Sequence, residues 1–180
     1  MTMRATGLVP AIIGPVQVAT PTADTVTARA THECQALWDT GASASVITEA
    51  VAAALGIAPT GRVKVQTAND ERDSNVYLVD ILLKNGVAFP NVTVTEGTIR
   101  GYDVLIGMDI ITQGDLAITN AGGKTVVSFR CPAYQEIDYL KEAPNGFLPG
   151  NREERRILDR TGRLNPASLG SSRPTGVRRK

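Results

Sequence analysis

Histidine, cysteine and long apolar runs are scarce in this sequence, and each scarcity argues against a class of function. The single histidine, His32, gives a Ser/His/Asp triad or a histidine-rich metal site little to draw on, and we expect it at the surface. The two cysteines, Cys34 and Cys131, are not at a metal-ligand spacing, so we expect core thiols, or a disulfide if their strands are adjacent. No stretch reaches the ~18 consecutive apolar residues of a transmembrane helix. We therefore expect no metal, no other cofactor and no membrane partner.

Charge is unevenly distributed along the chain. Residues 1–140 hold 9 Lys/Arg and 14 Asp/Glu, a net charge of −5, whereas residues 141–180 hold 10 Lys/Arg and 4 Asp/Glu, a net charge of +6. Residues 141–180 are also rich in Pro, Gly and Ser, and this composition predicts a mobile tail. Such a tail can attract phosphates, but it holds one aromatic residue, Phe147, for base stacking. A solvated tail is therefore favoured over a nucleic-acid partner.

The N-terminal residues 1–19 have some features of a signal peptide. Arg4 precedes an apolar stretch, but two prolines interrupt that stretch and no clear cleavage site follows. A cytoplasmic location is the favoured expectation.

One apolar run ends on a carboxylate, in the order Leu37-Trp38-Asp39-Thr40-Gly41-Ala42-Ser43. Asp and Gly are common turn formers, so an ordinary turn is one interpretation. The other is a turn that presents the Asp39 carboxylate to a facing copy, with a glycine that permits positive φ and a close backbone approach. A second apolar segment, residues 104–111, begins 65 residues after Asp39 and is interrupted by Gly107.

Together, in this order, the two segments resemble the retropepsin family of aspartic proteases. The resemblance covers roughly residues 14–131 and implies a closed all-β barrel with two short helices. Residues 1–13 then form an N-terminal extension, and residues 132–180 the basic tail. Because the chain has one Asp-Thr-Gly, a site with two carboxylates requires a homodimer, with one Asp39 from each subunit.

The resemblance also implies a role for each residue of the loop. The two Asp39 carboxylates would share a proton and activate water for hydrolysis of a peptide bond. The Thr40 hydroxyl would bond to the opposite loop, the Gly41 carbonyl would reach the substrate main chain, and Ala42 and Ser43 would complete the loop. Many retroviral enzymes have an ion pair between an Arg and a carboxylate at the places of Met108 and Ser43, and both charges are missing here. Loss of both partners leaves no unpaired buried charge.

The remaining elements follow from short apolar strands and turn signals. A hairpin of residues 16–19 and 25–30 is predicted to continue to Asp39. Thr48 and Gly56 are expected to cap a helix over residues 49–55. The other expected elements are strands at 63–67, 76–83, 92–94 and 102–106, a short helix at 108–112, and a final hairpin of 116–118 and 124–129.

In a retropepsin, the hairpin of residues 63–67 and 76–83 is the flap over the substrate. Its tip, residues 68–75, carries three acids and one Arg. If this tip contacts substrate, we expect a preference for basic side chains near the scissile bond. A solvated polar tip is the simpler interpretation.

A different class of function stays open. The same fold would also suit a catalytically silent, dimeric peptide-binding or scaffold module. The intact Asp39-Thr40-Gly41 argues against it, because two facing buried carboxylates cost stability and bring a scaffold no benefit. The sequence therefore favours an aspartic endopeptidase acting on polypeptides, with polyprotein or self-processing as the role that the resemblance implies.

Overall fold

The computed structural model describes residues 1–21, 29–66 and 71–138. The chain divides into two compact units, Met1–Gln135 and Glu136–Lys180, and only residues 136–138 of the second are described. The basic tail expected at residues 132–180 therefore lies almost entirely outside the described residues. None of the helices within the described ranges is long and apolar enough to cross a bilayer.

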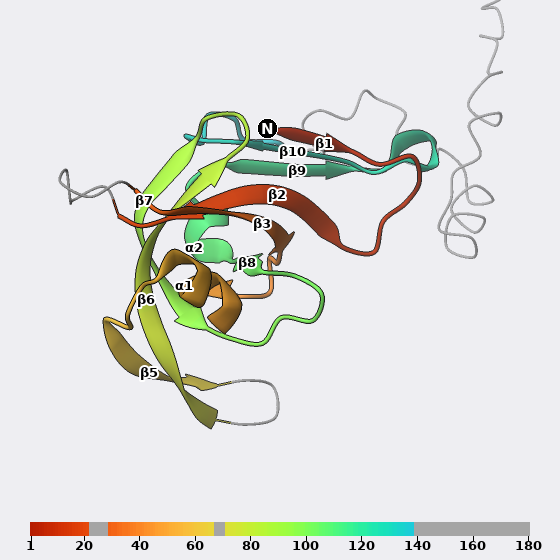
Figure 1. Ribbon diagram of the computed structural model, residues 1–180. Coiled ribbons are helices and arrows are strands. Elements are labelled where there is room, and N and C mark those ends of the chain that lie inside the picture. Colours follow the sequence, from red (N-terminus) through yellow and green to blue (C-terminus); the bar gives the residue numbers. More distant parts are fainter. Residues whose placement is uncertain (22–28, 67–70, 139–180) are drawn as a thin grey trace, which may run out of the picture. The chain divides into compact units, whose positions relative to one another are not determined.

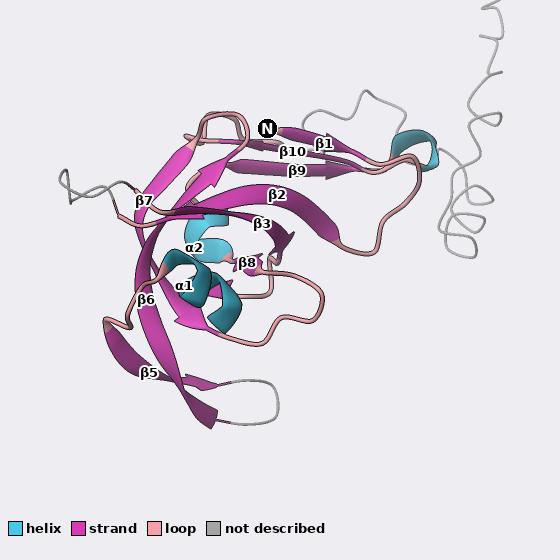
Figure 2. Ribbon diagram, viewed as in Figure 1, coloured by secondary structure: helices cyan, strands magenta, loops and turns pink. Residues whose placement is uncertain are grey.

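Six strands of the first unit close into a β-barrel (Figures 1 and 2). Each strand is hydrogen-bonded to the next in the order β2 (Ile12–Ala19), β3 (Thr31–Trp38), β8 (Val104–Ile106), β4 (Val46–Ile47), β7 (Ala88–Glu96) and β6 (Glu71–Leu83). The barrel closes because β6 also pairs with β2, so that Val16 lies opposite Leu83. β5 (Gly61–Gln66) continues the sheet beyond β6. The two short helices are α1 (Glu49–Leu55) and α2 (Met108–Ile111). The predicted all-β barrel with two short helices is confirmed.

A second sheet contains three strands in the order β1 (Thr2–Arg4), β10 (Val126–Arg130) and β9 (Asp115–Thr119). The predicted final hairpin corresponds to β9 and β10, which are joined through a 3-10 turn, η1 (Ala121–Gly123). β1 pairs with β10, with Thr2 opposite Ser128. Residues 1–13, expected as an extension, thus contain one strand of this sheet and the first residues of β2.

The core is built from alternating residues of the barrel strands. In β2 the buried side chains are Val16, Val18 and the final Ala19, and in β3 they are Cys34, Ala36 and Trp38. The Trp38 ring packs against that of Phe129, with 5.0 Å between centroids, so the core continues from the barrel to β10. Trp38 is therefore a core residue, at 4% exposure. Its side chain anchors the end of β3, where Asp39 follows.

Several predicted boundaries were wrong, and the predicted cap at Thr48 is confirmed in position but makes no capping bond. The second strand of the first hairpin begins at Thr31, and Ala30 precedes it as coil, while residues 25–28 fall outside the described ranges. Thr48 occupies the N-cap position of α1, but its hydroxyl makes no capping bond and has no partner among the described residues. Gly56 ends the helix as predicted, with φ +64°.

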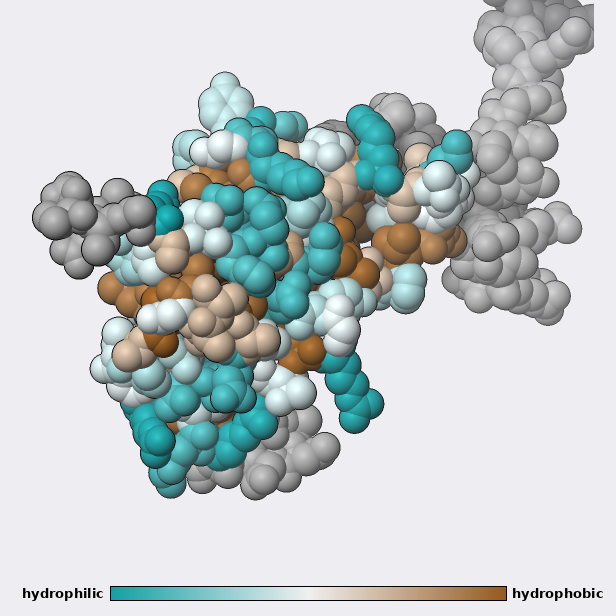
Figure 3. All heavy atoms as spheres, in the orientation of Figure 1, coloured by the Kyte–Doolittle hydropathy of each residue, from teal (hydrophilic) through white to brown (hydrophobic). Residues whose placement is uncertain are grey.

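The predicted flap hairpin is formed by β5 and β6, but its tip is shorter than expected. β6 begins at Glu71, so residues 71–75 belong to the strand rather than to the turn, and residues 67–70 lie outside the described part. Hydrophilic side chains gather over β5 and the adjoining end of β6 (Figure 3). A ribbon exposed in this way needs no apolar alternation, which explains why the sequence pattern placed its boundary too late.

Candidate functional site

Asp39 lies immediately after β3, at the point where this strand runs beside β8. The strands are parallel, and the Asp39 backbone N–H donates to the Ile106 carbonyl at 2.9 Å. The side chain is half-buried, and its Oδ1 accepts a hydrogen bond from the Gly41 N–H at 2.8 Å. The carboxylate is thus held by its own loop while part of it remains accessible to solvent.

The residues predicted with Asp39 form one continuous loop. Thr40, Gly41 and Ser43 are exposed, and Ala42 is half-buried with its carbonyl accepting the Met108 N–H at 2.8 Å. Gly41 does not use the positive φ that glycine permits, because it lies outside the left-handed region. A Cβ at this position would instead lie 3.1 Å from Asp39 Oδ1. Glycine is therefore favoured because the Asp39 carboxylate approaches its backbone closely.

Gly107 brings the second sequence motif against this loop. A Cβ on Gly107 would lie 2.6 Å from the carbonyl carbon and oxygen of Ala44 and 3.1 Å from the Ala42 oxygen. These contacts are shorter than the ~3.5 Å optimum for nonbonded carbon atoms, and all three are with backbone atoms. Gly107 therefore has a packing role, because only glycine leaves room for the backbone of the loop.

A carboxylate that the sequence analysis had given no role also contacts the loop. Asp109, in the first turn of α2, accepts hydrogen bonds from the hydroxyl of Ser45 at 2.8 Å and from its backbone N–H at 2.9 Å. Ser45 is fully buried. The sequence signals were an acid two positions after Gly107, which is Asp109, and a hydroxyl six positions after Asp39, which is Ser45. Neither signal by itself indicates that the two side chains meet.

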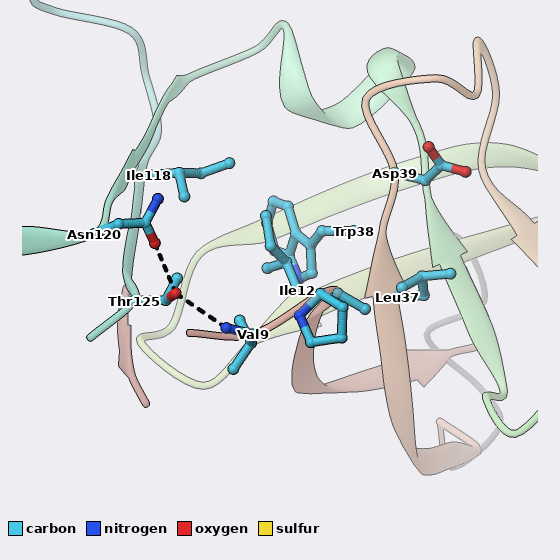
Figure 4. Close-up of a pocket in the computed structure, with 10 residues that line it drawn as sticks. Val9, Ile12, Leu37, Trp38, Asp39, Ile118, Asn120 and Thr125 are labelled. Carbon is cyan, nitrogen blue, oxygen red and sulfur yellow. Dashed lines mark hydrogen bonds between the residues drawn. The ribbon is translucent and has the colours of Figure 1, made fainter. Parts of the chain in front are cut away.

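An open pocket of about 470 Å³ borders Asp39 (Figure 4). In this view Asp39 and Leu37 lie on one side, Ile118 and Asn120 on the other, and Trp38 between them. Thr125 fixes the far wall, because its Oγ1 donates to Asn120 Oδ1 at 2.7 Å and accepts the Val9 N–H at 3.2 Å. This wall, which combines the N-terminal segment with the β9–β10 hairpin, was not predicted from the sequence.

Glu96 connects the end of β7 to the flap strand β6. Its Oε2 accepts hydrogen bonds from the Tyr77 hydroxyl at 2.6 Å and from Asn75 Nδ2 at 3.1 Å, and its backbone oxygen accepts one from the Ser74 hydroxyl at 3.0 Å. The Tyr77 bond, followed by that of Asn75, lowers the pKa of Glu96, whereas burial and then Glu96 raise the pKa of Tyr77. These bonds hold the base of the β5–β6 ribbon to the barrel.

The histidine and the two cysteines are the other residues considered as metal ligands or reactive groups. Over the described ranges, no group of three or more His, Cys, Asp or Glu side chains is arranged to hold a metal ion. His32 is half-buried in β3. Both cysteines are free thiols, and burial, with Asp103 and Glu33 nearby, raises the pKa of Cys34 to about 12.

Comparison with known proteins connects this site to one family. Residues 26–113 match the family described as "gag-polyprotein putative aspartyl protease". No curated protein matches the chain. A retropepsin-like aspartic protease from Rickettsia conorii is 15% identical over 67% of this chain and 94% of its own, with a TM-score of 0.39. A foamy viral protease-reverse transcriptase, solved with an RNA/DNA hybrid, is 19% identical over 81% of this chain and 17% of its own, with a TM-score of 0.36. With TM-scores below 0.5, neither likeness carries weight for this chain.

The closed barrel, with an Asp-Thr-Gly loop packed on the glycine that follows β8, defines an acid-protease type of domain. The family match spans both of these segments. This match over residues 26–113 supports assignment of the domain to the retropepsin-like aspartic proteases.

Proposed function

We propose that this protein is an aspartic endopeptidase whose active site forms between two copies of the chain. The observation that carries the proposal is the Asp39 loop, which presents a half-buried carboxylate at the end of β3 beside an open pocket. One chain supplies one such carboxylate, and a two-fold axis would bring a second Asp39 to face it.

The chemistry follows from two carboxylates in close proximity. Like charges at short distance do not both ionise easily, so the pair shares one proton, as is general for aspartic proteases. The ionised member accepts a proton from the attacking water, and the protonated member donates to the carbonyl oxygen of the scissile bond. The Gly41 N–H, at 2.8 Å from Asp39 Oδ1, fixes the orientation of each carboxylate. Thr40 and Ser43, both exposed, are available to the partner loop and to the substrate.

The substrate class is a polypeptide, and processing of a polyprotein or of the chain itself is the biological role that we infer from the family. The acids of the predicted flap tip would favour basic residues near the scissile bond. A cytoplasmic location remains the expectation from the sequence.

The proposal is tested by exposing a diverse peptide mixture to the wild type and to Asp39→Asn from acidic to neutral pH, with mass spectrometry of the products. We expect cuts from the wild type alone, with both proteins folded to the same extent. Equal cutting by both would exclude Asp39 chemistry. Absence of cutting by both, with peptide binding retained, would favour the scaffold function.

The shared site is tested by mixing the two proteins under conditions where subunits exchange. If each site needs two Asp39 side chains, an equal amount of Asp39→Asn should reduce the activity of a fixed wild-type concentration to about half, because mixed dimers are inactive. Unchanged activity would show that one chain suffices. Sedimentation of the mixture provides the control that both proteins are dimers.

A further inference from the structure

The loop from Asp39 to Ser45 is attached to four consecutive residues, 106–109. At its start, the Asp39 N–H donates to the Ile106 carbonyl at 2.9 Å. In its middle, the Ala42 carbonyl accepts the Met108 N–H at 2.8 Å. These two attachments use backbone atoms, so the sequence can vary there without removing them. The third attachment, at the end of the loop, is made by a side chain.

That third attachment is the bond between Asp109 and Ser45. Asp109 Oδ2 accepts the Ser45 N–H at 2.9 Å, and Oδ1 accepts the Ser45 hydroxyl at 2.8 Å and the Ile110 N–H at 3.0 Å. The Ser45 Oγ in turn accepts the Gly107 N–H at 3.1 Å. Each oxygen of the pair therefore has a donor, and the pair bridges the end of the loop to the first turn of α2.

A carboxylate suits this position because every group that faces it is a donor. Ionised aspartate accepts through both oxygens, whereas asparagine would turn an NH₂ group toward one of these N–H or O–H donors. Bonds to an ionised acceptor are also stronger than neutral ones. The pair is placed where the ion pair of many retroviral enzymes is missing, since Met108 and Ser43 carry no charge.

We propose that Asp109 is a positioning residue for the catalytic loop, acting through Ser45 to hold the Asp39 carboxylate in its working orientation. The inference rests on the proposed peptidase function for its kinetic consequence, but its structural part can be measured without activity. Because the two backbone attachments remain and the Ser45 carbonyl still accepts the Thr95 N–H at 3.2 Å, loss of the Asp109 bonds loosens the end of the loop without unfolding the barrel. A displacement of about 1 Å at a catalytic group is enough to lower kcat by tenfold to a hundredfold.

The test compares full-length Asp109→Asn and Ser45→Ala with a matched control, Asp103→Asn. Asp103 also uses a carboxylate oxygen to accept a backbone N–H of β3, that of Gln35 at 2.8 Å, but at a distance from the loop. At a temperature where all variants are folded, we expect kcat to fall about tenfold or more in the first two, with KM within about threefold, and to change less than twofold in the control. The kcat of the double variant, with Ser45→Ala and Asp109→Asn together, should be no lower than that of Asp109→Asn alone, because both substitutions break the same pair of hydrogen bonds.

Amide hydrogen exchange gives the readout that does not depend on turnover. We expect faster exchange at Gly41, Ala42 and Ser45 in Asp109→Asn and Ser45→Ala, and wild-type exchange there in Asp103→Asn. Unchanged kcat and unchanged exchange in the folded loop variants would overturn the proposal, as would equal losses in the control. If the wild type cleaves no peptide, the proposed function fails, and the exchange pattern alone decides whether Asp109 positions the loop.

Discussion

Replacement of Gly107 by alanine should destabilise the fold by a purely steric effect. Gly107 has φ −93° and ψ −174°, an extended conformation that alanine adopts freely, so no backbone strain contributes. The added Cβ would lie 2.6 Å from two backbone atoms of Ala44, about 1 Å inside the normal contact distance. The loop or β8 must therefore move apart.

The expected loss is about 1–3 kcal/mol, the usual cost of overpacking. In a folded unit of this size, each kcal/mol lowers Tm by about 4 °C. Urea unfolding followed by circular dichroism measures the difference. Because the displaced backbone belongs to the Asp39 loop, the rate of peptide cleavage by the folded variant should also fall, beyond what the loss in the free energy of unfolding explains.

Gly61→Ala is the matched control. Gly61 begins β5, lies outside the left-handed region, and has no atom within 4 Å of the position of an added Cβ. Alanine there should be neutral or stabilise by up to about 1 kcal/mol, because it restricts the unfolded chain. If Gly107→Ala and Gly61→Ala unfold at the same urea concentration, the inferred close contact between Gly107 and the loop is incorrect.

Two further predictions concern the core and the thiols. Phe129→Ala should destabilise the protein by about 3–5 kcal/mol in urea unfolding, because Phe129 is 1% exposed and packs on Trp38, whereas Tyr134→Ala, at an exposed ring, should change stability by less than about 0.5 kcal/mol. Iodoacetamide at pH 8 should modify Cys131 in the native protein and Cys34 only after unfolding, as read by mass spectrometry; rapid native labelling of Cys34 would contradict its burial. Since folding raises the pKa of Cys34 from 9.0 to about 12, its contribution to stability is fully present below pH 9 and is lost as the pH rises toward 12.

Local sequence patterns identified the elements whose stability is local. The α1 helix was predicted with its observed bounds because an Ala-rich run lies between Thr48 and Gly56. The final hairpin was predicted because its strands are close in the sequence and are joined by a turn with two glycines, Gly122 and Gly123. Both glycines adopt positive φ in the structure. Thr48 occupies the predicted cap position without a capping bond, because a capping residue type does not determine where its hydroxyl points.

Long-range contacts were beyond this kind of inference. β1 has three residues, too few for a periodic pattern, and it pairs with β10 at the other end of the folded unit. The pocket wall depends on the bond from Val9 to Thr125, and no local signal connects residues so far apart. Such pairings follow from closure of the whole unit, which only the three-dimensional structure provides.

Ser45 and Asp109 show how this limit affects the candidate site itself. The two residues are separated by 64 positions, and each has an ordinary local explanation, a turn hydroxyl and an acid in the first turn of a helix. The charged positions of the retroviral pattern correspond to Ser43 and Met108, which carry no charge here, whereas the bond of this chain joins Ser45 to Asp109. The loop is thus attached to α2 by a carboxylate with neutral donors instead of an ion pair. A family pattern identifies which segments meet, but the side chains that join them have to be established from the contacts of this chain.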